Sequence, residues 1–222
     1  MIRGQKISVV IPCYNEEDGV RHVLTGMPGY VDEVVVVDNN STDRTGEVAR
    51  SLGARVVFEP RPGYGAAYKA GLPAATGDII ATLDGDGSYP SDAIQPLAEH
   101  LVDRELDFIS GCRFPLADPK AMPFANQVGN NLLTLAMFVL FGRPVKDSQS
   151  GMWVFRRAVL KDLRLTSDGM PLSEEIKIEA LRRGLRFEEV HIRYLVRIGD
   201  VKLRKWRDGW ENLMFLVRKR FG

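Results

Sequence analysis

Residues 79–90 read Ile-Ile-Ala-Thr-Leu-Asp-Gly-Asp-Gly-Ser-Tyr-Pro, and this stretch decides the fold. Its short apolar run, rich in β-branched residues, is typical of a buried strand. The run leads to Asp84 and Asp86, and Gly85 and Gly87 allow the chain to turn sharply after it. Open α/β sheets bind ligands at the carboxyl ends of their strands, and paired carboxylates suit hard cations such as Mg2+ or Mn2+. The alternative is an ordinary solvated turn, since Asp-Gly pairs commonly form turns.

This strand is the fourth of five apolar runs that alternate with predicted helices. The predicted strands span 6–12, 34–38, 55–59, 79–83 and 106–110, and the predicted helices between them span about 15–27, 41–52, 63–75 and 90–102. Unbroken apolar strands separated by helices predict a parallel sheet that is covered on both faces. We therefore predict an α/β fold, with a mostly parallel, doubly wound sheet flanked by helices.

Length and composition limit the classes of protein to consider. The chain has 222 residues, which suits a single α/β domain, and its net charge of +1 gives no global field that favours nucleic acid. Cys13 and Cys112 lack metal-ligand spacing and are predicted to be reduced core thiols of a cytosolic protein. His22, His100 and His191 are isolated, which argues against a zinc site. No secretory signal is recognisable at residue 1.

Carboxylates follow three of the predicted strands. Glu16 comes just after the first strand, Asp38 ends the second, and Asp84 and Asp86 follow the fourth. Each of them alone is more often a helix cap or a turn residue. The glycine-rich motifs of dinucleotide-binding and P-loop proteins are absent from the sequence. Three carboxylate sites along one sheet edge therefore favour a pocket for a nucleotide and a metal ion.

The chain carries an ordered set of motifs in segments 9–17, 36–43, 63–67, 84–86, 147–151, 155–157, 188–192 and 197–202. This set resembles family 2 glycosyltransferases with the GT-A fold, and in particular the dolichol-phosphate mannose and glucose synthases of the polyprenyl-phosphate branch. Together these segments cover nearly the whole chain, from about residue 5 to residue 203.

The resemblance implies a nucleotide-sugar site. Its nucleobase and ribose contacts would come from Pro12, Tyr14, Glu16 and Asp38. Asp84 and Gly85 would also contact the nucleotide sugar, and Asp84 and Asp86 would bind a divalent cation, Mg2+ or Mn2+, at the diphosphate. Such a cation offsets the negative charge of the departing nucleoside diphosphate. Ser88 stands where this branch often has a further metal ligand, so we expect more dependence on Asp86, phosphate and water.

The second half of the chain should decide the acceptor. An acceptor hydroxyl needs a general base, whereas a lipid phosphate is already an anion and needs positive charge instead. Glu175, on a predicted helix over 173–183, aligns with a recurring family acid and is the candidate base. The resemblance implies an acceptor site made by Arg113, Ser150, Arg197 and Lys202. With Asp86 and Glu175, Arg197 is also a predicted catalytic residue, although any of these cations could be an ordinary surface residue.

Two segments predict contact with a membrane surface. Residues 130–141 form a mostly apolar helix, whose longest apolar run, 132–141, is too short to span a bilayer. In the C-terminal helix an apolar stripe is surrounded by basic residues; the stripe consists of Leu203, Trp206, Trp210, Leu213, Val217 and Phe221. This composition is typical of an interfacial anchor, but such a helix could also pack on its own domain or form a homo-oligomer.

These patterns predict one GT-A domain over 1–222, with a nucleotide-sugar half (1–112), an acceptor half (113–201) and an amphipathic C-terminal helix (202–222). The predicted enzyme is an inverting, metal-dependent glycosyltransferase that moves a hexose to a polyprenyl phosphate at the cytoplasmic face of a membrane. UDP-glucose is favoured over GDP-mannose as donor, because 84–90 resembles the glucose-type synthases. One alternative is a same-fold transferase acting on a hydroxyl acceptor in polysaccharide or glycolipid synthesis, with Glu175 as base. The other is a nucleotidyltransferase or nucleotide-binding module, although 12–16 lacks the glycine and cation of a phosphate loop.

Overall fold

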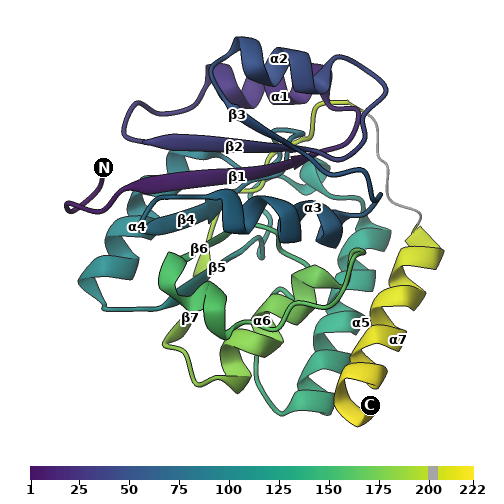
Figure 1. Cartoon of the computed structure of the whole chain (residues 1–222). Helices are drawn as coiled ribbons and strands as arrows, with labels where there is room; N and C mark the ends of the chain where they lie inside the picture. The colour runs from purple at the N-terminus through teal and green to yellow at the C-terminus, as the bar shows by residue number, and fades with distance from the viewer. Residues whose placement is uncertain (200–204) are drawn as a thin grey trace.

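A seven-stranded sheet forms the centre of the molecule (Figure 1). The computed structural model describes residues 1–199 and 205–222. The strands are β1 (Ile7–Cys13), β2 (Glu33–Asp38), β3 (Arg55–Phe58), β4 (Ile79–Thr82), β5 (Phe108–Cys112), β6 (Trp153–Arg156) and β7 (Phe187–His191). Their order is β3-β2-β1-β4-β6-β5-β7, and β6 runs antiparallel to both of its neighbours while the other pairings are parallel. The predicted α/β fold with a mostly parallel sheet is confirmed.

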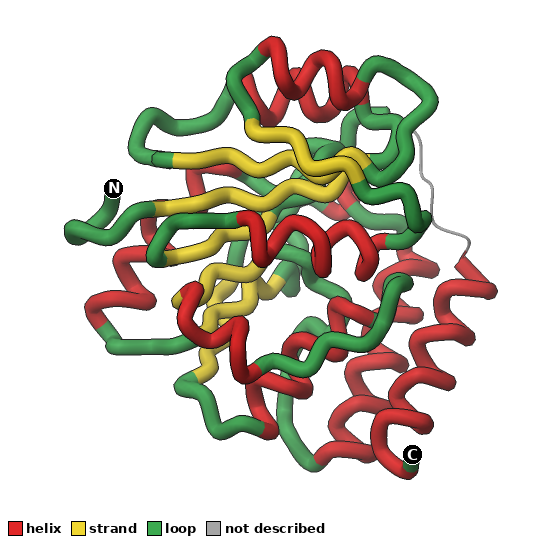
Figure 2. The backbone as a smooth tube through the Cα atoms, viewed as in Figure 1, coloured by secondary structure: helices red, strands yellow, loops and turns green. Residues whose placement is uncertain are grey.

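Helices cover both faces of this sheet (Figure 2). They are α1 (Glu17–Thr25), α2 (Thr45–Ser51), α3 (Tyr64–Gly71), α4 (Ile94–Asp103), α5 (Phe124–Phe141), α6 (Leu172–Arg182) and α7 (Lys205–Phe221). Apolar residues of α1, α2 and α4 join one buried cluster, and those of α3 and α6 join a second. Side chains alternate across a strand, so Val9 and Ile11 enter the first cluster while Val10 enters the second. This explains why the predicted strands are apolar at every position.

Helix α3 lies very close to the sheet. A Cβ atom at Gly71, its last residue, would lie 2.4 Å from a Val37 methyl carbon and 2.8 Å from a Val10 methyl carbon. Only glycine fits that approach without moving the helix. The close packing fixes α3, and therefore its first residues, relative to the carboxyl ends of β1 and β2.

Helices α5 and α7 lie side by side at the edge of the molecule (Figure 1). Helix α5 begins at Phe124, earlier than the predicted start at residue 130, and has 18 residues. Among the described helices, α5 alone is long and apolar enough to cross a membrane, judged only by its length and composition. The predicted apolar run 132–141 is therefore the C-terminal part of a longer helix.

The predicted C-terminal amphipathic helix is present as α7. Its inner face packs through Asn212 and Leu216, which are buried. The predicted apolar stripe points away from the domain, because Trp210 is 65% exposed and Phe221 is 75% exposed. The stripe residue Leu203 lies outside the described residues, and so does the side chain of Trp206.

Candidate functional site

A cavity of about 270 Å3 lies at the carboxyl ends of β1, β2 and β4, and is called the donor cleft below. It is lined by Pro12, Cys13, Tyr14, Glu16, Asn39, Pro62, Gly63, Tyr64, Ala67, Asp84, Gly85, Asp86, Met170 and Arg197. Parallel pairing of β1 with β2 and β4 brings the ends of these strands to one edge. Seven predicted site residues therefore meet in one cleft: Pro12, Tyr14, Glu16, Asp84, Gly85, Asp86 and Arg197.

The loop that carries the two aspartates packs tightly on β1. A Cβ atom at Gly85 would lie 2.5 Å from the Cys13 sulfur, so a side chain at this position would push the loop away. The loop is also held at Asp86, whose Oδ1 accepts a hydrogen bond of 2.9 Å from the Ser88 amide. Both carboxylates are thereby held at the floor of the donor cleft.

Arg197 supplies positive charge to this group of acids. Its Nη2 lies 3.1 Å from Asp86 Oδ2 and 3.4 Å from Glu16 Oε1. The segment around Arg197 is fixed by main-chain hydrogen bonds: Leu195 N donates to Ser88 O at 2.9 Å, and Ile198 N donates to Asp86 O at 2.8 Å. A residue far along the chain is therefore attached directly to the loop of the two aspartates.

Asp84 differs from Asp86 in its surroundings. Burial and the negative charge of Asp86 together raise the pKa of Asp84 to about 7, although Arg113 and Arg197 act to lower it. The Tyr64 hydroxyl, 3.5 Å away, also faces Asp84 Oδ1. Asp84 and Asp86, with one residue between them, place two negative charges in a buried cleft. This arrangement favours the binding of either a proton or a cation.

The donor atoms at this position fit a hard cation. Asp84 and Asp86 offer only oxygen, which is the ligand type that Mg2+ and Mn2+ prefer. Over residues 1–199 and 205–222, no group of three or more His, Cys, Asp or Glu side chains is placed to hold a metal. Two carboxylates with the remaining positions left to phosphate and water is the arrangement that Mg2+ adopts in phosphate sites.

Asp38 lies at the end of β2 but does not line the donor cleft. Its Oδ1 accepts a hydrogen bond of 3.0 Å from Ser41 N, which shapes the turn after the strand. The next residue, Asn39, does line the cleft. Asn39 Oδ1 accepts from Gly63 N at 2.8 Å, and its Nδ2 donates to Arg61 O at 2.7 Å.

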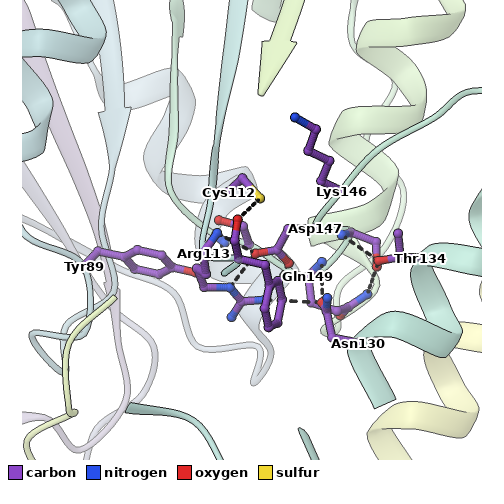
Figure 3. A network of polar contacts seen from close by, with 12 residues as sticks. Tyr89, Cys112, Arg113, Asn130, Thr134, Lys146, Asp147 and Gln149 are labelled. Carbon is purple, nitrogen blue, oxygen red and sulfur yellow. Dashed lines mark hydrogen bonds and ion pairs between the residues drawn. The ribbon is translucent and has the colours of Figure 1, made fainter. Parts of the chain in front are cut away.

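A second group of polar residues lies around Arg113 and Asp147 (Figure 3). Arg113 Nε and Nη2 each lie 2.7 Å from one oxygen of Asp147, and both side chains are buried. Although burial acts to raise it, the Arg113 guanidinium holds the pKa of Asp147 below its usual range. Arg113 Nη2 also donates to Asn130 Oδ1 of α5 at 3.3 Å. Arg113 is therefore a buried partner of Asp147 rather than a free surface cation.

The comparisons with known proteins agree with this arrangement. A model described as Glycosyl transferase family 2 matches residues 8–164. The chain belongs to this family. It is 40% identical over 199 residues to an uncharacterized glycosyltransferase of Mycobacterium tuberculosis, with 88% of each chain covered. It is 35% identical over 206 residues to a dolichyl-phosphate hexose transferase of Haloferax volcanii, covering 91% of this chain and 89% of the relative.

Solved structures are similar over nearly the whole family 2 chain. Glucosyl-3-phosphoglycerate synthase from Mycobacterium tuberculosis, in complex with Mn2+, UDP-glucose and glycerol 3-phosphate, matches with a TM-score of 0.77 at 25% identity, covering 98% of this chain and 80% of that one. The same enzyme in complex with phosphoglyceric acid matches with a TM-score of 0.77 at 26% identity, with the same coverage. The predicted GT-A fold is confirmed, and the chain is a glycosyltransferase.

Glu175, the predicted catalytic base of this family 2 enzyme, is held by neighbouring groups of its own chain. Its side chain is fully buried and is not among the residues of the donor cleft. Glu175 Oε2 accepts from Thr166 N and Ser167 N, both at 2.8 Å, and Oε1 lies 2.8 Å from Lys219 Nζ. These contacts occupy both carboxylate oxygens of Glu175. The role of Glu175 as a catalytic base stays a prediction.

The other predicted acceptor residues differ in how far the structure describes them. Ser150 is buried beside the strand β6, and its hydroxyl has no hydrogen-bond partner among the described residues. Lys202 lies outside the described residues. Sequence reasoning missed Asn39, Tyr64 and Met170, which line the donor cleft. Asn39 and Tyr64 fall within the motifs 36–43 and 63–67, so their segments could have pointed to the site, whereas Met170 lies in no recognised motif.

Glu174, next to Glu175, is a buried acid with an unusual pKa. Burial raises the pKa of Glu174 to about 8, although nearby Lys177 and a hydrogen bond from Gln149 act to lower it. That bond joins Gln149 Nε2 to Glu174 Oε1 at 2.6 Å, and Oε2 has no partner among the described residues. Between the ordinary pKa of 4.5 and about 8, the folded chain keeps a proton that the unfolded chain has released. The free energy of unfolding must therefore fall as pH rises through this window.

We expect Glu174→Gln to remove this pH dependence. Between pH 5 and 8, the free energy of unfolding of the wild type should fall relative to that of the variant by about 1.4 kcal/mol for each pH unit. Urea denaturation at three pH values measures it. Glu47→Gln, at an exposed position of α2, is the control and should parallel the wild type. Parallel curves for Glu174→Gln as well would contradict the shifted pKa.

Proposed function

We propose that this family 2 enzyme transfers a hexose from a nucleoside-diphosphate sugar to a polyprenyl phosphate. The observation that carries the proposal is the donor cleft itself, where Asp84, Asp86 and Arg197 meet. Two findings support the choice of substrates. The similar glucosyl-3-phosphoglycerate synthase binds Mn2+ and UDP-glucose, and the Haloferax volcanii relative is named a dolichyl-phosphate hexose transferase.

On the donor side, we assign the nucleobase and ribose to Pro12, Tyr14, Glu16 and Asp38, as the family resemblance implies. Tyr14 is exposed at the cleft and can lie against a base, while Glu16 is buried and offers carboxylate oxygens to hydroxyl groups. Asp38 would act from just outside the cleft lining. UDP-glucose remains the favoured donor over GDP-mannose.

Our proposed division of the domain remains a nucleotide-sugar half (1–112), an acceptor half (113–201) and a C-terminal helix (202–222).

At the diphosphate, Asp84 and Asp86 would hold Mg2+ or Mn2+. When bound, the cation offsets the negative charge that develops on the departing nucleoside diphosphate. Arg197 places a further positive charge at the same edge of the cleft. An oxygen of the acceptor phosphate would form the bond to the anomeric carbon as the bond from that carbon to the diphosphate oxygen breaks, with inversion.

On the acceptor side, the position of Glu175 favours a phosphate over a hydroxyl. A hydroxyl acceptor must lose a proton to a base, and Glu175, the candidate for that role, is bound to Lys219 and the Thr166–Ser167 backbone instead. A phosphate acceptor needs no base but needs cations. We assign acceptor binding to Arg113, Ser150, Arg197 and Lys202. Arg113 is paired with Asp147, and the buried hydroxyl of Ser150 has no hydrogen-bond partner among the described residues.

We further propose that the enzyme binds the cytoplasmic face of a membrane as a peripheral protein, where a polyprenyl phosphate would reside. Large apolar side chains project from one face of α5 at helical spacing and are exposed: Phe124, Val128, Leu132, Leu135 and Val139. The exposed apolar stripe of the adjacent α7 adds Trp210, Val217 and Phe221, and exposed cations lie beside it at Arg207, Arg218 and Arg220. Apolar faces bordered by cations suit an anionic bilayer surface.

We expect Leu132→Glu combined with Leu135→Glu to reduce binding to anionic vesicles by about 10-fold or more, since two apolar contacts become charged. Co-sedimentation with vesicles of phosphatidylglycerol and phosphatidylcholine measures the bound fraction. Leu52→Glu combined with Phe58→Glu is the matched control, at exposed positions just after α2 and at the end of the edge strand β3. Equal binding by both double variants would contradict a membrane-facing α5, and self-association lost with the first pair would indicate a homo-oligomer instead.

The reaction is tested with a panel of nucleotide sugars, Mn2+ or Mg2+, and a short polyprenyl phosphate. Lipid-linked hexose should form with UDP-glucose in preference to GDP-mannose, and only with the cation present. Product on a polysaccharide or glycolipid hydroxyl, with none on the lipid phosphate, would replace the proposed acceptor. Release of pyrophosphate from a nucleoside triphosphate would instead identify a nucleotidyltransferase.

A further inference from the structure

Lys219 pairs the C-terminal helix α7 with acidic residues of α6. Lys219 of α7 is largely buried, and its Nζ lies 2.8 Å from Glu175 Oε1 and 3.0 Å from Glu179 Oε1, both on α6. Glu175 in turn holds the segment that precedes α6. Its oxygens accept from the Thr166 amide and hydroxyl at 2.8 and 2.7 Å and from the Ser167 amide at 2.8 Å. The Lys219–Glu175 pair therefore connects α7 to residues 166–167.

The same segment supports the wall of the donor cleft. Asp168 O accepts a hydrogen bond of 3.0 Å from Ala66 N in the first turn of α3. The packing is so close that a Cβ atom at Gly63 would lie 2.2 Å from Asp168 O, and one at Gly65 would lie 2.3 Å from Ser167 O. Both glycines are therefore required by the approach of 167–168.

The supported residues are those that face the ligand. Gly63 and Tyr64 line the donor cleft, and so does Met170, which follows the supporting segment directly. Gly63 N is also bound to Asn39 Oδ1 at 2.8 Å, so a shift of this wall would reach the end of β2. A continuous series of contacts thus runs from Lys219 to one side of the donor cleft.

We propose that Glu175 and Lys219 are positioning residues that make the shape of the donor cleft depend on the seating of α7. The buried carboxylate of Glu175 has Lys219 as its ion-pair partner. Without the lysine, this negative charge stays buried with hydrogen-bond donors alone, and the cost of its burial falls on the segment that it holds. The identity of the ligand rests on the proposed function, whereas the contacts themselves do not.

The test uses Lys219→Met in the full chain, with Arg218→Met as the control. Arg218 is the neighbouring cation but is exposed, so its loss removes a charge from α7 without touching Glu175. Isothermal titration with UDP and Mn2+ should show about a 10-fold weaker UDP affinity for Lys219→Met. Arg218→Met should stay within about twofold of the wild type. Lys219→Arg, which keeps the charge, should recover most of the affinity.

Hydrogen exchange of the ligand-free protein tests the positioning role of Lys219 without relying on the proposed nucleotide donor. The amides of Gly63 and Ala66 should exchange faster in Lys219→Met than in Arg218→Met, because Ala66 N donates to Asp168 O of the supported segment and Gly63 packs directly against it. If the wild type fails to bind UDP with Mn2+, the proposed donor is wrong and the exchange rates alone decide the inference. Equal exchange in both variants would overturn it, as would equal UDP affinity in two folded variants. Should Lys219→Met not fold, Glu175→Gln takes its place against the same control.

Discussion

Replacing Asp86 by asparagine is expected to reduce sugar transfer by about 1,000-fold, which is the upper range for loss of one preorganised electrostatic group. The amide keeps the size of the side chain and one oxygen, which can still accept from the Ser88 amide. It removes the negative charge that would bind the cation and that now pairs with Arg197 at 3.1 Å. Initial rates with saturating nucleotide sugar measure the effect, and titration with Mn2+ measures the accompanying loss of metal affinity.

The control for this variant is Asp103→Asn. Asp103 is an exposed acid at the end of α4 and pairs with Arg3 on the surface, so its activity should match the wild type. A thermal melt of Asp86→Asn checks that the variant is folded at the temperature of the assay. If the folded variant kept Mn2+ affinity and activity within about tenfold, the cation would have to bind elsewhere, and the assignment of the donor cleft would fail.

The part of the fold that could be predicted from sequence is the part built from fully buried parallel strands. The runs in β1, β2 and β4 are apolar at successive positions because both faces of the sheet are covered there. The sequence did not predict β6 or β7. Strand β6 has four residues and ends in Arg156, and β7 lies at the sheet edge with Glu188 and Glu189 in its centre. Such short or mixed strands depend on their neighbours for pairing, which local pattern cannot show.

The residues of the candidate site likewise fall into those that the sequence could place and those that it could not. Asp84 and Asp86 could be placed with Pro12 and Glu16 because parallel strands that pair bring their carboxyl ends together. Met170 could not, because it reaches the cleft only through the packing of its segment on α3. The ion pair of Glu175 with Lys219 could not be predicted either, because family resemblance places a residue on a helix without showing which way its side chain points.

The role of Arg113 can be either acceptor binding or charge neutralisation. Sequence resemblance assigns it to the acceptor site, whereas in the structure it forms a buried ion pair with Asp147. Replacing Arg113 by methionine leaves a carboxylate buried without its guanidinium partner. We expect the free energy of unfolding to fall by about 3–5 kcal/mol, the usual cost of breaking a buried ion pair from one side. Urea denaturation at neutral pH measures it. Arg193→Met, which removes a cation from an exposed pair with Asp92, should change stability by less than about 1 kcal/mol.

A second variant separates stability from acceptor binding. Combining Arg113→Met with Asp147→Asn removes both charges, and the asparagine oxygen can still accept from the backbone amide of residue 113, now 3.1 Å from Asp147 Oδ2. Part of the lost stability should return, because Asp147 no longer leaves a negative charge buried without its guanidinium, while buried Lys177 loses the attraction of that charge. If Arg113 also binds the acceptor phosphate, the double variant will bind UDP with Mn2+ like the wild type yet show a raised KM for polyprenyl phosphate. If its role is only to neutralise Asp147, the restored fold will restore that KM too, and the acceptor assignment of Arg113 will have to be withdrawn.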